Sequence, residues 1–159
     1  MEEQQFLKNI NENKGIIIKI VNLYADDAED RKDLHQEIIF QAWKAASGFK
    51  GEAKFSTWLY KISLNVALTH LSKIKKHAKI NEGVSMVPYE YPAELSERAD
   101  QLYRAIRQLT EVDRGLIMLH LDGYDNAAIG EIMGITKNNT GVKLHRIKQQ
   151  LSDILDKKK

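Results

Sequence analysis

The segment 127–151, AAIGEIMGITKNNTGVKLHRIKQQL, contains two short helical patterns separated by a turn. Gly134 interrupts the first pattern. Thr136 is a predicted N-cap of the second, because a threonine hydroxyl accepts a hydrogen bond from a free amide of the first turn. In both halves the apolar residues recur at helical spacing and share one face. These residues are Ile129, Ile132 and Met133, followed by Leu144, Ile147, Leu151 and Ile154.

The other face of the second helix is polar and basic. A face of this kind, backed by a buried stripe, is what a helix needs to read the major groove of DNA. Gly130 and Gly134 fit a close helix crossing and a tight turn, so the segment predicts a helix-turn-helix. A surface helical hairpin with a solvated basic face is the alternative, because such hairpins are common. The face carries Lys137, Asn138, Asn139, Lys143, Arg146 and Lys148.

Composition sets the limits on fold and location. The chain has 159 residues and is 43% hydrophobic, which suits one domain or two small ones that share a linker. The absence of cysteine excludes disulfides, thiolate metal sites and cysteine nucleophiles. No apolar run approaches the roughly 18 residues that span a bilayer. Residues 1–15 carry both charge signs and lack the apolar core of a signal peptide, so we expect a cytoplasmic protein.

The formal net charge of +2 is unevenly distributed. Residues 53–81 contain six lysines and no acidic residue. Residues 131–159 contain six lysines and one arginine against three acidic residues. Between these two basic blocks, residues 82–113 contain seven acidic residues against three arginines. The pattern indicates two contacts with a polyanion, although solvated surfaces could also produce it.

Helical periodicity predicts three helices in the first half of the chain, over 2–24, 30–46 and 57–76. Gly15 weakens the middle of the first helix, and Ser56 is a predicted N-cap of the third. A polar face on the second helix is interpreted as solvated. The predicted inward residues are Phe6, Ile10, Ile17, Val21 and Tyr24, then Leu34, Ile38, Ala42 and Trp43, and then Leu59, Ile62 and Val66.

The second half begins after a segment, 78–95, that has no helical period and contains both prolines of the chain. As a flexible coil it would span roughly 25 Å on average and about 60 Å when fully extended. No long stretch alternates apolar and polar residues. We therefore predict an all-α fold of two small helical domains, residues 1–77 and 96–159, joined by a flexible linker over 78–95.

Two more helices are predicted before the helix-turn-helix. Residues 96–109 form the first, and Thr110 caps the second with Asp113 at its third position, near a capping-box pattern. Asp122 and Gly123 end the second helix. The apolar residues predicted to lie inward are Leu102, Ile106 and Leu109, then Leu116, Ile117, Leu119 and Leu121.

A second candidate nucleic-acid surface lies on the helix predicted over 57–76. Trp58, Lys61 and Asn65 share one face, with Tyr60 nearby. Aromatic rings between lysines suit single-stranded nucleic acid, because bases stack on rings while lysines hold phosphates. The alternative is that Trp58 and Tyr60 are core residues, which is the commoner fate of such side chains. We expect Trp58 to be partly buried, and Lys61 and Asn65 to be exposed.

Nothing in the sequence predicts catalysis. There is no P-loop and no GxGxxG, and no pair of carboxylates lies beside a histidine in an obvious site. The histidines lack HExxH-type metal spacing, and each is interpreted as a surface or packing residue. We therefore expect no enzyme, no cofactor and no metal. The histidines are His35, His70, His77, His120 and His145.

Two motif blocks, in the right order, resemble the extracytoplasmic-function (ECF) sigma factors of bacteria. The first block is similar to sigma domain two of that family, and the second to sigma domain four. Together they cover nearly the whole chain except the linker. The first consists of DLHQE at 33–37, AW at 42–43, FKGEAKFSTWLYKI at 49–62 and Asn65. The second consists of Leu109, DR at 113–114, LDGY at 121–124, IGEIMGI at 129–135 and KLHR at 143–146.

The resemblance implies a role and a set of partners. These are core RNA polymerase, through its beta-prime clamp helices and beta flap, and promoter DNA, with an anti-sigma factor as a further partner that the family allows. The family has no cofactor, and no membrane insertion of the chain itself is expected. Domain two would read the minus-ten element as opened strand, and domain four the minus-thirty-five element as duplex. The residues that match the polymerase-docking face are Asp33, Gln36, Glu37 and Gln41.

Site residues follow from the same resemblance. The loop 49–55 matches the one that captures a flipped base, and Asn65 matches a base-contacting position. The predicted minus-ten residues are Phe49, Lys50, Lys54, Phe55, Trp58, Tyr60, Lys61, Asn65, Lys73 and Lys76. The predicted minus-thirty-five residues are Thr136, Lys137, Asn138, Asn139, Thr140, Lys143, Arg146 and Lys148.

The recognition helix departs from the family pattern. The family often has GTVKSR where this chain has NNTGVK over 138–143, so the register of base contacts stays open. Gly141 costs about 1 kcal/mol of helix stability, but a glycine also permits close approach of the backbone to phosphates.

Two other classes of protein were weighed. An ordinary helix-turn-helix regulator, with an N-terminal domain that senses a ligand or dimerises, would not explain the acid-free block beside Trp58 and Asn65. A protein-interaction adaptor or an enzyme lacks a recognisable site. Transcription that depends on core polymerase, in a purified system, separates all three classes.

Overall fold

In the computed structural model, residues 1–76 and 97–157 are described, with residues 72–76 described by backbone alone. Within these ranges the chain forms eight α-helices and one short 3-10 helix and has no strand, which confirms the all-α prediction. The chain divides into two compact units, Met1–Tyr91 (unit 1) and Pro92–Lys159 (unit 2). The predicted linker lies outside the described residues, so its limits stay a prediction. Among the described helices, none combines the length and hydropathy of a membrane span.

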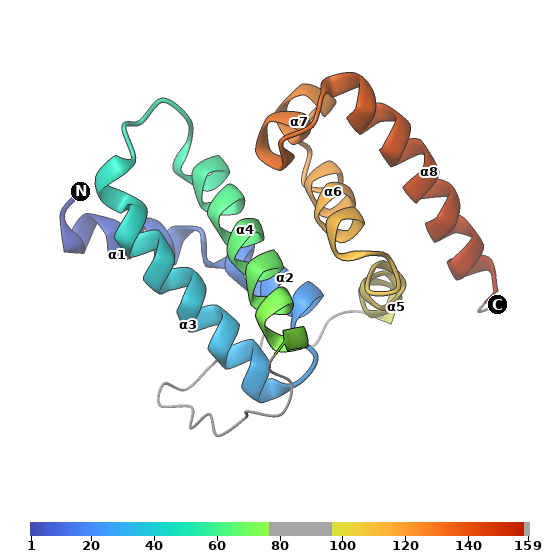
Figure 1. Cartoon of the computed structure of the whole chain (residues 1–159), viewed down its shortest axis with the longest axis horizontal. Helices are drawn as coiled ribbons and strands as arrows, with labels where there is room; N and C mark the ends of the chain where they lie inside the picture. Colours follow the sequence, from blue (N-terminus) through green and yellow to red (C-terminus); the bar gives the residue numbers. More distant parts are fainter. Residues whose placement is uncertain (77–96, 158–159) are drawn as a thin grey trace. The chain divides into compact units, whose positions relative to one another are not determined.

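Unit 1 is a small helical bundle in which α2, α3 and α4 pack against one another (Figure 1). Its helices are α1 (Glu3–Glu12), α2 (Lys14–Tyr24), α3 (Ala28–Ala45), the 3-10 helix η1 (Ala46–Gly48) and α4 (Phe55–Lys76). All five residues predicted to lie inward on the first helix are buried, as are Leu34, Ile38 and Ala42. The largest fully buried side chains of the unit are Tyr24, Tyr60, Phe6, Ile17, Ile20, Leu23, Leu34, Ile38, Leu59 and Leu64.

The single helix predicted over 2–24 is instead two helices that meet at Asn13. This residue has φ −119° and ψ 19°, outside the helical region. Its side-chain amide donates to the carbonyl of Asn9 at 2.8 Å. Asparagine offers the backbone such an alternative bond, and this favours a helix end. The break therefore lies at Asn13, two residues before the glycine that was expected to weaken the helix.

Helix α4 also differs from its prediction. It begins at Phe55, and the N–H of Trp58 donates to the carbonyl of Lys54 at 3.1 Å, so Ser56 lies in the first turn and is not the N-cap. Its buried residues also differ in part from those predicted, because Ile62 and Val66 are only half-buried. The buried residues of α4 are Leu59, Tyr60, Ser63, Leu64 and Ala67.

Trp43 was predicted to point inward but is 42% exposed. Its ring lies over that of Phe6, with the centroids 5.0 Å apart, so it covers the seam between α1 and α3. The indole therefore packs on the edge of the core, partly exposed, and does not lie at its centre.

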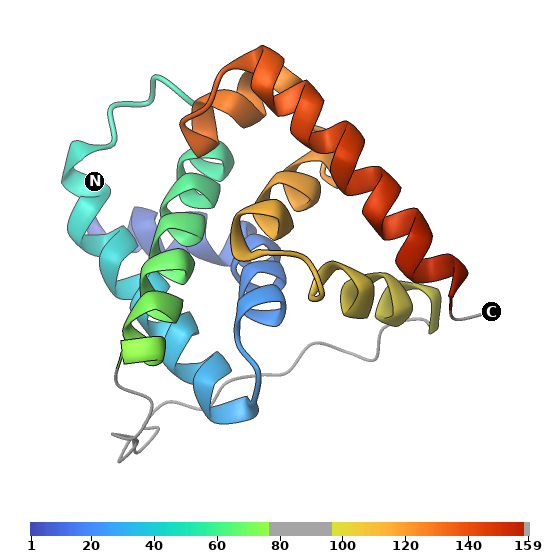
Figure 2. The ribbon, with the colours of Figure 1, turned by 45° about the vertical axis from the view of Figure 1, so that its right-hand side comes forward.

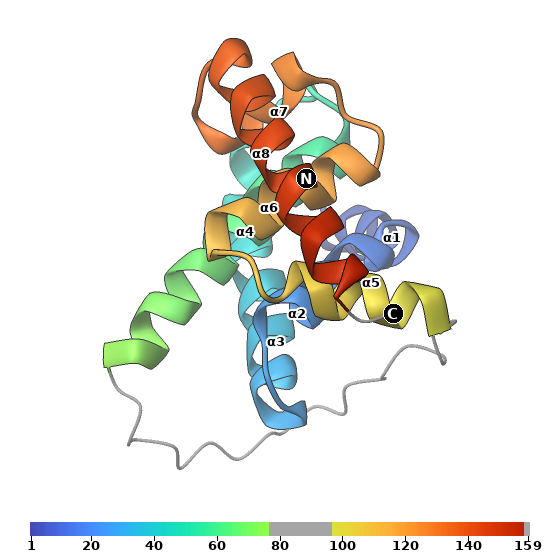
Figure 3. The same ribbon diagram turned by 90° about the vertical axis from the view of Figure 1, so that its right-hand side faces the viewer.

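Unit 2 consists of α5 (Glu97–Ile106), α6 (Glu111–Leu121), α7 (Asn126–Met133) and α8 (Lys137–Asp156). Helix α8 contacts the other three, and α5 lies near its C-terminal half (Figures 2 and 3). The predicted capping residues at the starts of α6 and α8 each accept a backbone N–H, as expected, and Asp125 caps α7 in the same way. Leu121, predicted to lie inward, is exposed. The capping bonds run from Asp113 to Thr110 (3.4 Å), from Ala128 to Asp125 (2.8 Å) and from Asn139 to Thr136 (3.0 Å).

Two glycines shape the turn between α7 and α8. Gly134 ends α7 in the left-handed region, with φ 77°. At Gly130 a Cβ atom would lie 2.6 Å from the backbone oxygen of Ile135 and 3.1 Å from Oγ1 of Thr140. The N–H of Ile135 donates to the carbonyl of Gly130 at 2.9 Å, which holds the turn against α7. The two helices thus meet at a point where only glycine fits, as the sequence predicted.

Candidate nucleic-acid and docking surfaces

The polar face of α3 lines an open hollow of about 760 Å³ between α3 and α4. All four residues predicted to dock on polymerase line this hollow, together with one residue predicted to bind the minus-ten element, Asn65. The structure therefore brings the two predicted sites of unit 1 side by side. The lining residues are Asp33, Gln36, Glu37, Phe40 and Gln41 from α3, and Asn65, Val66, Thr69 and His70 from α4.

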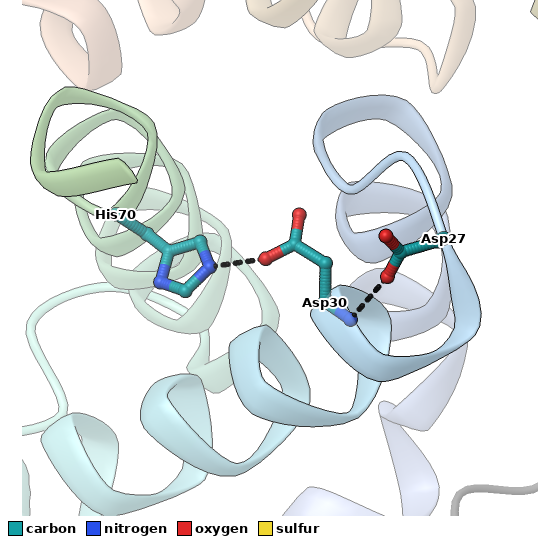
Figure 4. Close-up of polar contacts among 3 residues, drawn as sticks. All are labelled: Asp27, Asp30 and His70. Atoms are coloured by element: carbon teal, nitrogen blue, oxygen red, sulfur yellow. Dashed lines mark hydrogen bonds and ion pairs between the residues drawn. The ribbon is translucent and has the colours of Figure 1, made fainter. Parts of the chain in front are cut away.

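A polar contact between His70 and Asp30 joins the two walls of the hollow. His70 Nε2 lies 2.8 Å from Asp30 Oδ1, and both side chains are mostly buried (Figure 4). The backbone N–H of Asp30 donates to Oδ1 of Asp27, the N-cap of α3, also at 2.8 Å. Asp30 thus links the first turn of α3 to α4, and this fixes the spacing of the walls at one end of the hollow.

Two carboxylates on α3, Asp33 and Glu37, face the hollow in different environments. Partial burial, and then the negative charge of Asp30, raise the pKa of Asp33. The carboxamide of Gln41 donates to Glu37 Oε1 at 2.9 Å and orients that carboxylate. A raised carboxyl pKa means that the ionised form is disfavoured in the free protein. A partner with basic side chains would remove that penalty, so this face is suited to a basic surface.

Phe40 is a candidate docking residue that reasoning from the sequence missed. Its side chain is 54% exposed although it is a large apolar group. It lies in the same hollow, and Lys44 Nζ lies 5.3 Å from its ring centroid. The signal was present in the sequence, because Phe40 follows Gln36 by four residues and Glu37 by three and so shares their stripe. Aromatic residues at the centre of a polar face are typical anchors of protein interfaces.

The predicted base-capture loop starts and ends in a cluster of three aromatic rings. Phe49 lies 5.1 Å from Trp58 and 5.8 Å from Phe55, and Phe55 lies 5.2 Å from Trp58, measured between ring centroids. The three rings are half-buried, whereas Lys50 and Lys54 in the loop between them are exposed. The cluster combines partly open aromatic faces with nearby cations, as surfaces that bind single strands do.

The outer stripe of α4 extends this surface along the helix. Lys61 and Asn65 are exposed and Trp58 is half-buried, as predicted. Tyr60 is only 1% exposed and belongs to the core, which corrects its assignment as a DNA-binding residue and favours the core alternative for it. Lys73 and Lys76 lie on the last turns of α4, where side chains are outside the described part of the structure.

In unit 2, α8 presents a stripe opposite its buried face. Asn138, Val142, His145 and Gln149 recur at intervals of four, three and four residues, and all four are exposed or half-buried, with Val142 the most open of the described valines. Val142 is 62% exposed, compared with 46% for Val112. Val142 and His145 were missing from the predicted contacts, although their spacing from Asn138 identifies the stripe. A shallow hollow beside it is lined by Asn126, Lys137, Asn138, Gly141, Val142 and His145.

The residues predicted to contact the minus-thirty-five element differ in position. Thr136, Lys137, Asn138 and Asn139 are exposed at the start of α8. Thr140 is fully buried, and its hydroxyl donates to the carbonyl of Thr136 at 2.8 Å, which corrects its assignment as a DNA contact.

The basic residues of α8 beyond its first turn flank the stripe. Arg146 Nη2 lies 3.8 Å from Asp113 Oδ2 on α6, and Lys143 is half-buried. Burial, and then the positive charge of Lys148, lower the pKa of His120 at the end of α6. Cations at the edges of a reading helix are placed for phosphates more than for bases.

Comparison with known proteins decides the family. A model of Sigma-70 region 2 matches residues 10–77, and a model of Sigma-70, region 4 matches residues 99–151. The ECF sigma factor SigW of Bacillus subtilis is 25% identical over 85% of this chain and 88% of its own length. The chain belongs to the ECF-type sigma factors. SigM of Mycobacterium tuberculosis is 23% identical over 86% of this chain and 70% of its own length.

Other matches are shorter or concern the fold. The sigma-H factor of Pseudomonas aeruginosa is 39% identical over 57 residues, which span 36% of this chain and 28% of that protein. The sigma factor RpoE of Bartonella quintana, solved with the anti-sigma factor NepR, has a TM-score of 0.70 at 16% identity and covers 97% of this chain and 96% of its own. CnrH, solved with the cytosolic domain of CnrY, has a TM-score of 0.72 at 16% identity. The match covers 99% of this chain and 92% of CnrH. Both matches concern the fold, and the first shows that it is the fold of a sigma factor.

Membership settles the class of protein. As an alternative sigma factor of the ECF type, the chain directs promoter-specific transcription and is an initiation factor, not an enzyme. Its two sigma domains imply binding to core RNA polymerase and to promoter DNA. The homologues act with RNA polymerase in the cell interior. The predicted sigma-factor function is therefore confirmed, and the regulator, adaptor and enzyme alternatives are set aside.

Proposed function

We propose that the two units divide the work of promoter recognition in the cytoplasm. Unit 1 docks on the beta-prime clamp helices of core polymerase through the hollow between α3 and α4 and reads the minus-ten element as opened strand. Unit 2 contacts the beta flap and reads the minus-thirty-five element as duplex through α8. The observation that carries the proposal is that Asn65 shares one hollow with all four candidate docking residues. Strand capture would then occur beside the polymerase contact.

Binding at two places compensates for two small surfaces. Each unit presents one helix stripe and a short adjoining segment, so each alone would bind DNA weakly. Attachment to one polymerase and one chain raises the effective concentration of the second contact once the first is made. The test of the proposed function is transcription from a cognate promoter with purified core polymerase, which should depend on this chain. Equal transcription without the chain would refute the proposal.

Strand opening needs a compensating interaction in unit 1. Taking a base out of the stack costs a few kcal/mol. Stacking on the aromatic cluster of Phe49, Phe55 and Trp58, contacts from Lys50 and Lys54 to phosphates, and hydrogen bonds to base edges would offset that cost. Asn65 is suited to the last task because its carboxamide both donates and accepts.

We predict that Asn65→Ala reduces strand opening more than it reduces binding of the closed duplex. The carboxamide would contact a base only after that base has left the stack, so its loss should fall on the opened state. Permanganate reactivity of thymines near the minus-ten element measures opening, and retention of duplex DNA at low temperature measures binding. Asn11→Ala, an exposed asparagine on α1, is the matched control. Unchanged permanganate reactivity in Asn65→Ala would remove this residue from the strand contacts.

For Lys143→Ala we expect weaker duplex binding and a shallower dependence on salt. Removal of one lysine–phosphate ion pair should reduce the slope of log K against log salt by about 0.9. Binding of the holoenzyme to a labelled promoter, measured at several potassium chloride concentrations, gives that slope. Lys157→Ala, an exposed lysine just beyond α8, should leave the slope as it is. A slope unchanged by Lys143→Ala would place this lysine away from the phosphates.

An anti-sigma factor is a further proposed partner. Among the similar solved structures, one is the sigma factor RpoE bound to the anti-sigma factor NepR, and another is CnrH bound to the cytosolic domain of CnrY. In this chain the exposed ring of Phe40 and the carboxylates on α3 would suit a partner with apolar and basic side chains. Such a partner would compete with polymerase for the same face. Competition between core polymerase and a candidate partner for the labelled chain tests this, and simultaneous binding would contradict it.

A further inference from the structure

The exposed stripe of α8 is aliphatic and uncharged at its centre. Its members, Asn138, Val142, His145 and Gln149, include neither arginine nor lysine. The apolar group of Val142 is 62% exposed and faces no other part of the described unit that would bury it. Covering this valine with an apolar group of a ligand would be favourable, because apolar surface would be removed from water.

The cations nearby do not occupy that centre. Arg146 Nη2 lies 3.8 Å from Asp113 Oδ2 on α6, and Lys148 is not a member of the stripe. Lys143 is half-buried, and Lys137 lies in the first turn of the helix. Guanine in the major groove is read mainly by arginine or lysine through its O6 and N7 acceptors. This stripe lacks such a group at its middle positions.

The side-chain amide of Asn126 lies beside the stripe, next to Gly141, which has no side chain. At Gly141 a Cβ atom would lie 3.3 Å from Nδ2 of Asn126, the first residue of α7. The amide of Asn126 therefore occupies the space into which a longer side chain at position 141 would project. The hollow at this point is lined by two asparagines and a valine in addition to Lys137, Gly141 and His145. Asn138 and Val142 are matched to adenine and thymine, because asparagine pairs with adenine N6 and N7 and apolar groups contact the thymine methyl. Lys137, at the start of α8, is placed to contact a phosphate.

Resting on the proposed role of α8 as the minus-thirty-five reading helix, we propose that Val142 and Asn138 make this factor specific for A·T pairs. Val142 contacts the C5-methyl group of a thymine, and Asn138 contacts the N6 and N7 edge of an adenine. The minus-thirty-five element of this factor therefore carries A·T pairs opposite the centre of α8, and the flanking lysines hold phosphates.

The first test is a selection with the holoenzyme. Promoters that share one minus-ten element and have a randomised minus-thirty-five element are bound, recovered and sequenced. We expect A·T pairs to be enriched at the central positions. Val142→Ser should lose the thymine preference at one position, while Val112→Ser, an exposed valine at the start of α6, should keep it. Enrichment of guanine or cytosine at every selected position, or a thymine preference that survives Val142→Ser, overturns the proposal.

The second test uses base analogues in the selected promoter. Replacing the thymine by deoxyuridine removes one methyl group and should weaken wild-type binding about fourfold. Replacing the adenine by 7-deazaadenine removes one acceptor and should weaken it about fivefold. The deoxyuridine effect should vanish in Val142→Ser and the deazaadenine effect in Asn138→Ala. Wild-type binding that is indifferent to both analogues overturns the inference while the proposed function stands. A holoenzyme that selects no minus-thirty-five sequence at all would refute the proposed function and the inference together.

Discussion

Replacing Phe40 by alanine is expected to weaken binding of the chain to core RNA polymerase by at least about 30-fold. An aromatic anchor at the centre of an interface typically contributes about 2 kcal/mol or more, which corresponds to that factor. Phe40 meets the description because it is 54% exposed in the free chain and lies among the carboxylates that line the hollow of α3 and α4. Titration of core polymerase into the fluorescently labelled chain measures the affinity.

The control for this experiment is Leu7→Ala. Leu7 on α1 is also 54% exposed, so the two variants remove large apolar groups of equal exposure from different faces of unit 1. We expect Leu7→Ala to bind as the wild type does, and Glu37→Ala to lose binding as Phe40→Ala does. If Phe40→Ala and Glu37→Ala both kept full affinity, the docking face would have to lie elsewhere on unit 1.

The second large effect is expected at Gly130. Gly130→Ala should reduce the free energy of unfolding of unit 2 by about 3 kcal/mol and abolish duplex binding at the minus-thirty-five element. The reason is that the new methyl group would lie 2.6 Å from the backbone oxygen of Ile135. That oxygen belongs to the turn between α7 and α8, so relief would require the two helices to move apart. Chemical denaturation of the full chain, followed by circular dichroism, measures the loss.

Gly141→Ala is the matched control, since it adds the same methyl group to a helical glycine of the same unit. Its nearest neighbour is the side-chain amide of Asn126, at 3.3 Å, which can rotate away. Alanine is favoured over glycine in a helix by about 1 kcal/mol, so this variant should be as stable as the wild type or more so. Equal loss of stability in the two variants would show that the close contact at Gly130 is not what distinguishes them.

The helix-turn-helix could be predicted from the sequence in detail because its signals are local. The caps at Thr136 and Asp125 each accept from an amide three residues away, and the left-handed end of α7 at Gly134 depends on a single residue. The need for glycine at position 130 follows from the tightness of the same turn. Each of these features is decided within one hairpin, so no knowledge of distant packing was required.

Burial of individual residues was less predictable because it depends on which helices meet. The exposure of Lys61 and Asn65 and the partial burial of Trp58 were predicted correctly. Tyr60, one position from Lys61, instead faces the core formed with α2 and α3. Thr140 is polar and near the start of α8, yet it lies against Gly130 and is covered by α7. The polar side chain of Thr140 favoured exposure, whereas tyrosine is found both in cores and on surfaces. In both cases the packing of the helices decided the burial.

Two functional candidates were missed for the opposite reason. Phe40 and Val142 are apolar, so their residue type favours the core, but helical spacing places them among polar residues on exposed stripes. An apolar residue at a position where the period demands a polar one is a signal of a binding surface. That signal was available in the sequence and becomes convincing once the exposure of each side chain is known.

The central claim is that unit 1 captures an opened strand while it is bound to polymerase. The direct measurement compares the affinity of the holoenzyme for two promoters that differ only at the minus-ten element, one fully paired and one with the non-template strand unpaired there. The claim predicts tighter binding to the unpaired promoter, and Asn65→Ala should reduce that advantage. Equal affinity of the wild-type holoenzyme for the two promoters would contradict it.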